Sequence, residues 1–482
     1  MNRTSFSVLA AFGVLANFSA SAADADLQAL REEVAQIRKI YEQRIDALEK
    51  RLVDAERKAA DLSRTADLTT ETASQAKMAR EASREPTAAS AFNPEISLIL
   101  SGMYTNTAQD PRQDPTGAAG RERRIQGLLP AGGEFNPEAR AWNLGESELA
   151  ISANIDPHVR GTFLAAISPA NLIGVEEAHI RTIGLGNGIG IKAGRFFSGI
   201  GYANERHPHA WDFSNAALPY EAFFGARLGY DGLQVKWLAP TDLFLEVGAE
   251  FGRARGFPAS DGERNKNGLM SGSLFAHVGG DVGVANSWRA GASVFASKPR
   301  DRTYEDADST NTLVTNSFSG KSNTTVLDFV WKWAPQGNAK ERGFTFHSEW
   351  VRRREAGTLT YDTTAASLGT ATDTFRSTQS GFYAQGVWQF MPRWRAGYRY
   401  DRLSTPAISV GLVHNATLAV ADLPLLQAFA PRRHTAMVDY SASEFSRVRL
   451  QLARDQTRPG VNDNQLWLHY IMSVGAHGAH TY

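Results

Sequence analysis

Apolar and polar residues alternate with a period of two over most of the chain, from about residue 93 to the C-terminus. In the segment 243–251, for example, Leu245 and Val247 share one face of an extended chain, and Glu246 and Glu250 lie on the other. Such segments are about ten residues long and end at turn residues. The pattern predicts an all-β region of antiparallel strands, although a soluble β-sandwich alternates in the same way.

The connections between these segments distinguish the two architectures. Short turns such as Asp156-Pro157 and Met391-Pro392 alternate with long connections such as 198–225 and 403–431. Short turns on one rim and long loops on the other are typical of an outer-membrane barrel. About sixteen segments follow this rule, and they begin near residues 95, 143, 159, 173, 188, 226, 242, 268, 286, 324, 342, 379, 393, 432, 446 and 463. We predict a transmembrane antiparallel β-barrel of about 16 strands, or of about 18 if 298–323 and 403–431 hide a further hairpin.

The width of such a barrel explains the polar face of its strands. A barrel of about sixteen strands encloses an aqueous channel, whereas one of about eight is filled by its own side chains. Trp237, Trp331 and Trp394 lie near strand ends, where the aromatic girdles of a membrane barrel are expected. We therefore expect the apolar faces to contact lipid and the polar faces to line a water-filled lumen.

The N-terminus has the composition of an export signal. Arg3 precedes the mostly apolar stretch 6–18, and Ala20-Ser21-Ala22 provides small residues for cleavage. A membrane anchor would need roughly 20 apolar residues, and this stretch is shorter. Residues 1–22 are therefore predicted to be a secretory signal peptide, and residues 93–482 a barrel in the cell outer membrane.

Residues 23–64 follow a different, helical period. Apolar residues recur at alternating spacings of three and four, with one irregular step of four from Tyr41 to Ile45, and mixed charges lie between them, as in a coiled coil. These apolar residues are Leu27, Leu30, Val34, Ile37, Tyr41, Ile45, Leu48, Leu52, Ala55, Ala59 and Leu62. We predict a periplasmic coiled coil that associates with other copies of the chain. The alternative is a solitary solvated helix packed on its own domain. Residues 65–92 are rich in Thr, Ala and Ser and are predicted to be a flexible linker.

Composition excludes several functional classes. The chain has 482 residues, and its 51 Lys and Arg balance 51 Asp and Glu. This balance lacks the basic excess that nucleic-acid binding usually needs. The absence of cysteine excludes disulfides, thiol nucleophiles and cysteine-ligated clusters.

No motif of an enzyme stands out in the sequence. The glycines from 184 to 190 lie at a predicted hairpin turn and lack the following helix that a dinucleotide-binding site requires. With no hydrolase, protease or phosphate-loop motif either, we expect no enzymatic activity.

Several short strings stand out in the barrel region: 176–179, 192–197, 201–202, 207–213 (His-Pro-His-Ala-Trp-Asp-Phe), 237–241 and 473–482. They resemble a family of Gram-negative outer-membrane barrel proteins, described as porin-like or as zinc-regulated TonB-dependent outer-membrane receptors. The resemblance covers about 93–260 and 380–482. It implies a trimeric channel for passive diffusion of small hydrophilic solutes. A TonB-dependent receptor needs an N-terminal globular plug and about 22 strands, so the receptor label suits this chain poorly.

The same resemblance implies that the third long loop, 198–225, folds inward and narrows the channel. Its ionisable residues are the candidate constriction residues: Glu205, Arg206, His207, His209, Asp212 and Glu221. Alternation places a second set on the lumen wall: Glu146, Glu148, Arg160, Glu177, His179, Arg181, Lys192, Arg393, Arg395, Arg399, Arg447 and Arg449. Fixed charges around a narrow pore select solutes by sign. The alternative is that these charges only solvate the lumen.

Paired histidines suggest a metal site as a second hypothesis. His207 and His209, completed by a carboxylate such as Asp212, could bind zinc, and His477 with His480 form a weaker pair. Pro208 equally suits a rigid loop in which the histidines only form hydrogen bonds. No other cofactor is indicated.

The sequence therefore favours an outer-membrane porin. The alternatives are a zinc-related outer-membrane receptor and a structural tether between outer membrane and periplasm. The expected partners are the lipid bilayer with lipopolysaccharide, two further copies in a homotrimer, the barrel assembly machinery, and small hydrophilic solutes. The terminal Tyr482 is a candidate part of the signal that this machinery recognises.

Overall fold

The computed structural model describes residues 94–110, 124–128, 140–168, 172–259, 267 and 271–475. All of them belong to the second of two compact units, Ala88–Tyr482. The predicted signal peptide, coiled coil and linker lie outside the described residues, as do His477, His480 and Tyr482. Within the described ranges, no helix is long and apolar enough to cross a bilayer.

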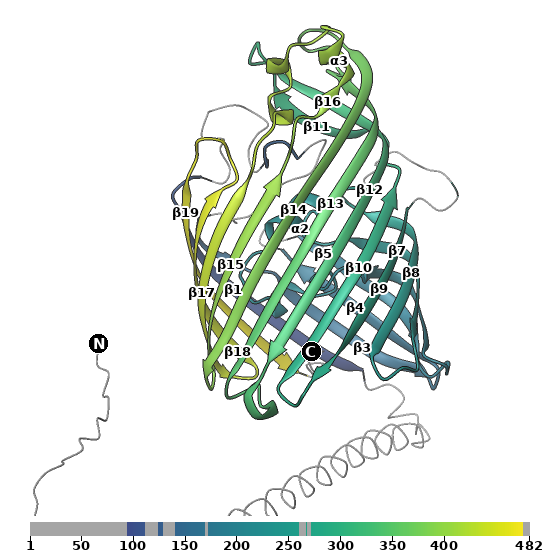
Figure 1. The fold of residues 1–482 in the computed structure, drawn as a ribbon, viewed down its shortest axis with the longest axis vertical. Coiled ribbons are helices and arrows are strands. Elements are labelled where there is room, and N and C mark those ends of the chain that lie inside the picture. Colours follow the sequence, from purple (N-terminus) through teal and green to yellow (C-terminus); the bar gives the residue numbers. More distant parts are fainter. Residues whose placement is uncertain are drawn as a thin grey trace, which may run out of the picture. The chain divides into compact units, whose positions relative to one another are not determined.

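The described residues form one closed antiparallel sheet (Figure 1). Its strands are β1 (Glu95–Thr107), β2 (Ala141–Leu144), β3 (Ser147–Asp156), β4 (Val159–Ile167), β5 (Ile173–Thr182), β6 (Ile189–Phe197), β7 (Gly229–Leu238), β8 (Phe244–Arg255), β9 (Ser271–Val282), β10 (Asn286–Ser297), β11 (Arg302–Ala307), β12 (Leu313–Trp333), β13 (Gly343–Tyr361), β14 (Ala371–Met391), β15 (Trp394–Ser404), β16 (Ser409–Val410), β17 (Arg432–Ser443), β18 (Ser446–Gln456) and β19 (Asp463–Gly475). Helical turns are short: η1 (Pro208–Ala210), α2 (Leu218–Phe224), η2 (Pro335–Gly337), α3 (Gly411–His414), η3 (Val420–Asp422) and η4 (Pro424–Leu426).

Sixteen strands build the wall of the barrel, which confirms the predicted fold class. Both β2 and β3 pair with β1 and so form one interrupted barrel strand. β11 and β16 pair only with strand extensions outside the wall. β1 pairs with β19 from Ser97 opposite Gly475 to Thr107 opposite Gln465, and this pairing closes the sheet. Closure leaves no exposed sheet edge, so the backbone hydrogen bonds of the wall are made within it.

The two faces of the wall differ in polarity as the alternation predicts. On β18, the side chain of Leu452 is 53% exposed on the outside, whereas its neighbour Gln451 is fully buried on the inside. The same contrast separates Leu450 from Arg449. An apolar exterior around a polar interior is the arrangement that lipid on one side and water on the other require.

Three strands are longer than the alternation predicts. β12 begins at Leu313 rather than near 324, and β14 begins at Ala371 rather than near 379. Together with β13 they extend beyond the rest of the wall toward the end that carries α3 (Figure 1). Residues 313–323 are mostly Ser, Thr, Asn and Gly, so no regular apolar alternation marked this extension, which pairs with β11 and β13. The suspected extra hairpin in 298–323 exists as β11 with β12, but it adds no strand to the wall.

The extension has an apolar core of its own. Residues from β11, β12, β13, β14, α3 and the segment after it pack together; the buried set includes Tyr304, Phe318, Leu359, Phe375, Leu412 and Leu426. The opposite rim instead has tight turns such as Pro392-Arg393. Arg393 lies in this turn with a positive φ of 70° and is exposed. The prediction that Arg393 lies on the lumen wall was therefore wrong, because the chain reverses at this residue before β15 begins.

Candidate functional site

The connection between β6 and β7, residues 198–228, lies inside the barrel and contacts its wall on many sides. The backbone N–H of Gly199 donates to Glu250 of β8 at 2.7 Å, and that of Leu218 donates to Asp401 of β15 at 2.8 Å. Every residue of α2 is buried. We call residues 198–228 the inner loop.

One part of the inner loop meets an acidic wall, formed by Glu146, Glu148, Glu176 and Glu177. His207 Nε2 lies 2.9 Å from Glu177 Oε1, and its Nδ1 lies 3.3 Å from an oxygen of Glu148 and 3.3 Å from one of Glu176. Burial by itself lowers the pKa of His207, but the three carboxylates outweigh it and raise the pKa to about 10. A charged imidazolium therefore holds this part of the loop to the wall.

A β-bulge explains how two consecutive glutamates reach the same histidine. Leu164 of β4 pairs with Glu177, but the next residue, Ala165, pairs with Val175. Glu176 is the extra residue, and a bulge re-aims the side chain that it displaces from strict alternation. Strict alternation places Glu177 on the inner wall and gives no sign that Glu176 also faces inward.

Arg227, at the end of the inner loop, also binds the acidic wall. Its guanidinium donates to Glu176 at 2.6 Å and to Glu146 at 3.2 Å, and Nη1 lies 3.1 Å from His207 Nδ1. His209 Nδ1 lies 3.0 Å from the second oxygen of Glu148. Arg227 was not among the predicted residues because it lies beyond the predicted loop boundary at 225.

Asp212 and Glu221 of the inner loop meet a basic wall, formed by Arg395, Arg399, Arg433, Arg447 and Arg449. Asp212 accepts a hydrogen bond from Arg395 at 2.9 Å, and Arg395 also binds Asp439 at 2.6 Å. Burial would raise the pKa of Asp212, but Arg395 and Arg449 keep it below its ordinary value. Asp212 is thus engaged on β15, far from the β5 side that holds His207, and does not join the histidines as the predicted third zinc ligand.

The other arginines of the basic wall bind the loop backbone. Arg399 donates to the carbonyl oxygens of Asn215 and Ala216 at 3.0 and 3.1 Å. Arg449 donates to the carbonyl of Trp211 at 2.7 Å, and Arg447 donates to that of His209 at 2.5 Å. These predicted wall residues do lie on the inside, and their guanidinium groups are directed to the inner loop.

Glu205 and Arg206 lie on the β6–β7 side of the loop. Glu205 pairs with Lys236 at 3.3 Å and with Lys192 at 3.9 Å. Burial would raise the pKa of Glu205, but the two lysines lower it to about 2. The guanidinium of Arg206 stacks on the ring of Tyr202, 4.1 Å from its centroid.

The remaining predicted wall residues lie apart from the inner loop. Arg160 of β4 pairs with Glu95, near the rim with tight turns. His179 lies 3.5 Å from Glu177 and 3.3 Å from the carbonyl of Arg195. Arg181 is opposite Lys192 in the β5–β6 pairing and is exposed.

Glu349 of β13 is a central contact of the inner loop and was not among the predicted residues. It accepts backbone N–H groups of Tyr202 and Ala203 at 3.3 and 3.0 Å, and the hydroxyl groups of Tyr220 and Tyr383 at 2.7 and 2.6 Å. A period-two signal existed, because polar residues recur inward on this strand at His347, Glu349, Arg353 and Glu355. Without the loop contacts, nothing singled Glu349 out.

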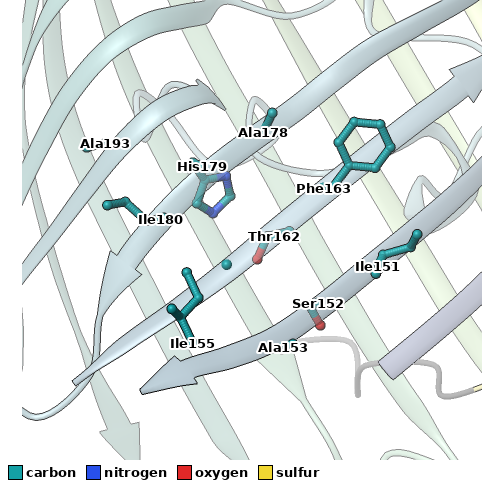
Figure 2. A pocket seen from close by; sticks show the side chains of 11 residues that line it. Ile151, Ser152, Ala153, Ile155, Thr162, Phe163, Ala178, His179, Ile180 and Ala193 are labelled. Atoms are coloured by element: carbon teal, nitrogen blue, oxygen red, sulfur yellow. The ribbon is translucent and has the colours of Figure 1, made fainter. Parts of the chain in front are cut away.

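An apolar depression on the outer face of the barrel is separate from this site. Its volume is about 450 Å³, and outward residues of β3 to β6 line it, including Ile155, Phe163 and Ile180 (Figure 2). All three are exposed on the apolar exterior. The depression faces away from the inner loop and is not part of the lumen.

Comparison with known proteins gives one match in sequence and several in structure. No family model matches the chain. Among solved structures it is similar to a loop-deletion form of OmpT, an outer membrane protein of Vibrio cholerae (TM-score 0.47, 11% identity, 79% of this chain and 99% of that one). It is also similar to Pseudomonas putida OprB (TM-score 0.45, 15% identity, 79% and 94%) and to the outer membrane channel DcaP of Acinetobacter baumannii (TM-score 0.44, 11% identity, 79% and 97%). An uncharacterized protein of Aquifex aeolicus is 30% identical over 424 residues, which cover 82% of this chain and 81% of that protein.

Proposed function

We propose that this chain, which belongs to the same family as the uncharacterized Aquifex aeolicus protein, is an outer-membrane porin. Its closed barrel is the basis of the proposal. Its substrates would be small hydrophilic solutes that cross the outer membrane by passive diffusion. The apolar exterior supports insertion into a bilayer, and a barrel of about sixteen strands is wide enough for a wet lumen.

One observation carries the proposal: a charged loop is held inside the barrel by complementary charges. The inner loop directs His207 and Arg227 to the acidic wall, and Asp212 and Glu221 to the basic wall. A loop attached on both sides narrows the lumen at a defined place. A narrow passage between charged walls strengthens the field on a passing ion, so such a loop sets selectivity.

The selectivity residues of the proposal are the charges at the contact between the inner loop and the basic wall that remain accessible to solvent. The side chains of Asp212 and Arg395 are each 24% exposed, whereas Arg449 and Arg433 are fully buried. A solute can therefore approach the Asp212–Arg395 pair, and the deeper arginines act by holding the loop. Neutralising Asp212 removes a negative charge from the passage, and neutralising Arg395 removes a positive one.

The assembly would be a homotrimer in the outer membrane, with lipid and lipopolysaccharide around the apolar belt and the coiled coil in the periplasm. Barrel assembly machinery would insert it. These parts of the proposal rest on the apolar seam of residues 23–64 and on the fold.

Single-channel conductance in a planar bilayer, with the reversal potential measured under a salt gradient, tests the proposal. We expect current steps in groups of three. Asp212→Asn should shift the permeability ratio toward anions and Arg395→Gln toward cations, each by about two-fold. Arg393→Gln is the matched control, because it removes the same charge from an exposed turn. A correctly folded barrel that conducts no current would exclude the porin function.

A further inference from the structure

We propose that Glu148, Glu176 and His207 bind a divalent transition-metal ion such as zinc, between the inner loop and the acidic wall. One ligand atom from each residue lies within 4.8 Å of the other two. The histidine comes from the loop, and the glutamates come from β3 and β5. A bound ion would therefore link the inner loop to two strands of the wall.

The distances around His207 suit tetrahedral coordination. Nδ1 of His207 lies 3.3 Å from Oε2 of Glu148 and 3.3 Å from Oε2 of Glu176. Metal–ligand bonds of about 2.0–2.1 Å in a tetrahedron separate neighbouring ligand atoms by about 3.3–3.4 Å. Two of the three distances between ligand atoms, those from His207 Nδ1 to the two carboxylate oxygens, thus already have the length that a bound zinc ion would require.

The same two carboxylate oxygens have no hydrogen-bond donor. Oε2 of Glu148 and Oε2 of Glu176 are both buried, and neither accepts a hydrogen bond. The side chain of Glu148 is only 1% exposed. The positive group that these oxygens face is the His207 imidazolium, 3.3 Å from each and too poorly aligned to donate a hydrogen bond. An ion in place of the Nδ1 proton would bond to both oxygens directly.

The neighbouring groups orient the three ligands as they do in known metal sites. The Nε2 side of His207 meets Glu177 at 2.9 Å, so its Nδ1 is directed to Glu148 and Glu176, and an ion would bind there in place of the proton that Nδ1 carries. His209 lies 3.0 Å from Oε1 of Glu148, which leaves Oε2 for the ion. Carboxylate–histidine contacts of this kind typically fix ligand orientation in metal sites. His209 is therefore a positioning residue and not, as the sequence suggested, a ligand.

Arg227 competes with the ion for the same ligands. Its Nη1 lies 3.1 Å from His207 Nδ1, and its Nη2 lies 2.6 Å from Oε1 of Glu176. A metal ion must displace the guanidinium from Nδ1 before it can bind. The affinity of the site is therefore set by this arginine as well as by the ligands, and removing Arg227 should increase it.

The ligand set selects the class of ion. One imidazole with two carboxylates suits zinc and neighbouring transition metals. Calcium and magnesium prefer oxygen ligands alone and more of them. Magnesium at millimolar concentration should therefore not displace zinc.

Isothermal titration of the full-length protein in detergent with zinc chloride tests the proposal. The parent protein and every variant carry His477→Gln and His480→Gln and no affinity tag, so that the terminal histidines cannot bind the ion. We expect one saturable site per chain. His207→Gln and Glu176→Gln should weaken binding by at least about ten-fold, and Arg227→Gln should tighten it several-fold.

His277→Gln is the matched control, because His277 lies 3.2 Å from Glu246 without a second carboxylate in contact. Its zinc affinity should equal that of the parent. The proposal is wrong if the parent shows no saturable binding, or if His207→Gln binds as the parent does. The tighter binding of Arg227→Gln keeps the test decisive, because a misfolded variant would not gain affinity.

Discussion

Burial inside a polar barrel changes how single side chains titrate, and Glu221 of α2 shows this most clearly. It is 4% exposed and pairs with Arg433 at 3.2 Å. Burial raises the pKa of Glu221 to about 7, Asp401 adds to the effect, and Arg433 opposes it. Arg433 opposes it only in part, because it also lies 3.6 Å from Asp401 and 3.9 Å from Asp455. The charge of α2 therefore changes close to neutral pH.

The pH dependence of stability follows from this raised pKa. An unfolded glutamate titrates near 4.5, so the contribution of Glu221 to folding is fully present below that pH and is lost as the pH rises through about 7. Glu221→Gln does not titrate. Relative to wild type, its apparent Tm should increase by a few degrees between about pH 4.5 and 7. Thermal scans at a fixed rate from pH 4 to 8 measure this difference.

Glu205→Gln serves as the control for Glu221→Gln. Glu205 belongs to the same loop, but its pKa is lowered to about 2, so its charge is constant over this range. The Tm difference between Glu205→Gln and wild type should be flat from about pH 5 to 8. If Glu221→Gln is equally flat, Glu221 is ionised throughout and the raised pKa is wrong.

At the scale of the element, the inner loop depends on one close approach to β13. Gly201 has a positive φ of 63°, which favours glycine, and a Cβ at this position would lie 2.3 Å from Oε2 of Glu349. Glu349 is 1% exposed and accepts four hydrogen bonds from groups of the loop and of β14. The buried carboxylate of Glu349 therefore holds the inner loop inside the barrel, and the loop comes close enough to it only because residue 201 has no side chain.

Gly201→Ala should release the inner loop from β13. The methyl group displaces Glu349 from the loop N–H groups, and the loss of hydrogen bonds to a charged group costs about 3 kcal/mol. We expect noisier single-channel currents and faster proteolysis within 198–228, both measured on the folded protein in detergent. Gly184→Ala is the control: Gly184 has a φ of 75°, but nothing lies within 4 Å of its added Cβ. Equal behaviour of the two variants would show that backbone strain alone, and not the contact with Glu349, is responsible.

At the scale of the whole molecule, we propose separate tasks for the barrel and the predicted coiled coil. The barrel completes its own sheet through the β1–β19 pairing. The seam of residues 23–64 carries apolar positions that a single helix would leave in water. We therefore assign oligomeric state to the coil and permeation to the barrel.

Changing Leu30, Ile37, Leu48 and Leu52 together to Gln tests this division. The variant loses the apolar seam, so a trimer held by the coil should dissociate to monomers while the conductance of each barrel stays that of wild type. Size-exclusion chromatography with light scattering measures the mass, and bilayer recording measures the current. A variant that stays trimeric would assign the contact between subunits to the barrel wall.

The sequence by itself determined the wall of the barrel. The strands predicted to begin near 95, 159, 286, 432, 446 and 463 begin at those residues. Alternation is a local property, because successive side chains of a strand point to opposite faces, and lipid outside with water inside imposes it on each strand separately. The rim with tight turns was equally readable, since Pro and Gly mark turns locally.

Only the tertiary structure decided which charges meet. The bulge that turns Glu176 inward, the contact of Glu349 with Gly201, and the division of the inner loop between the acidic and basic walls join residues far apart in sequence. Alternation assigns a residue to a face and says nothing of its partner across the lumen. Those partners are set by how far the loop reaches and by the balance of burial against opposite charge, which exist only once the sheet has closed.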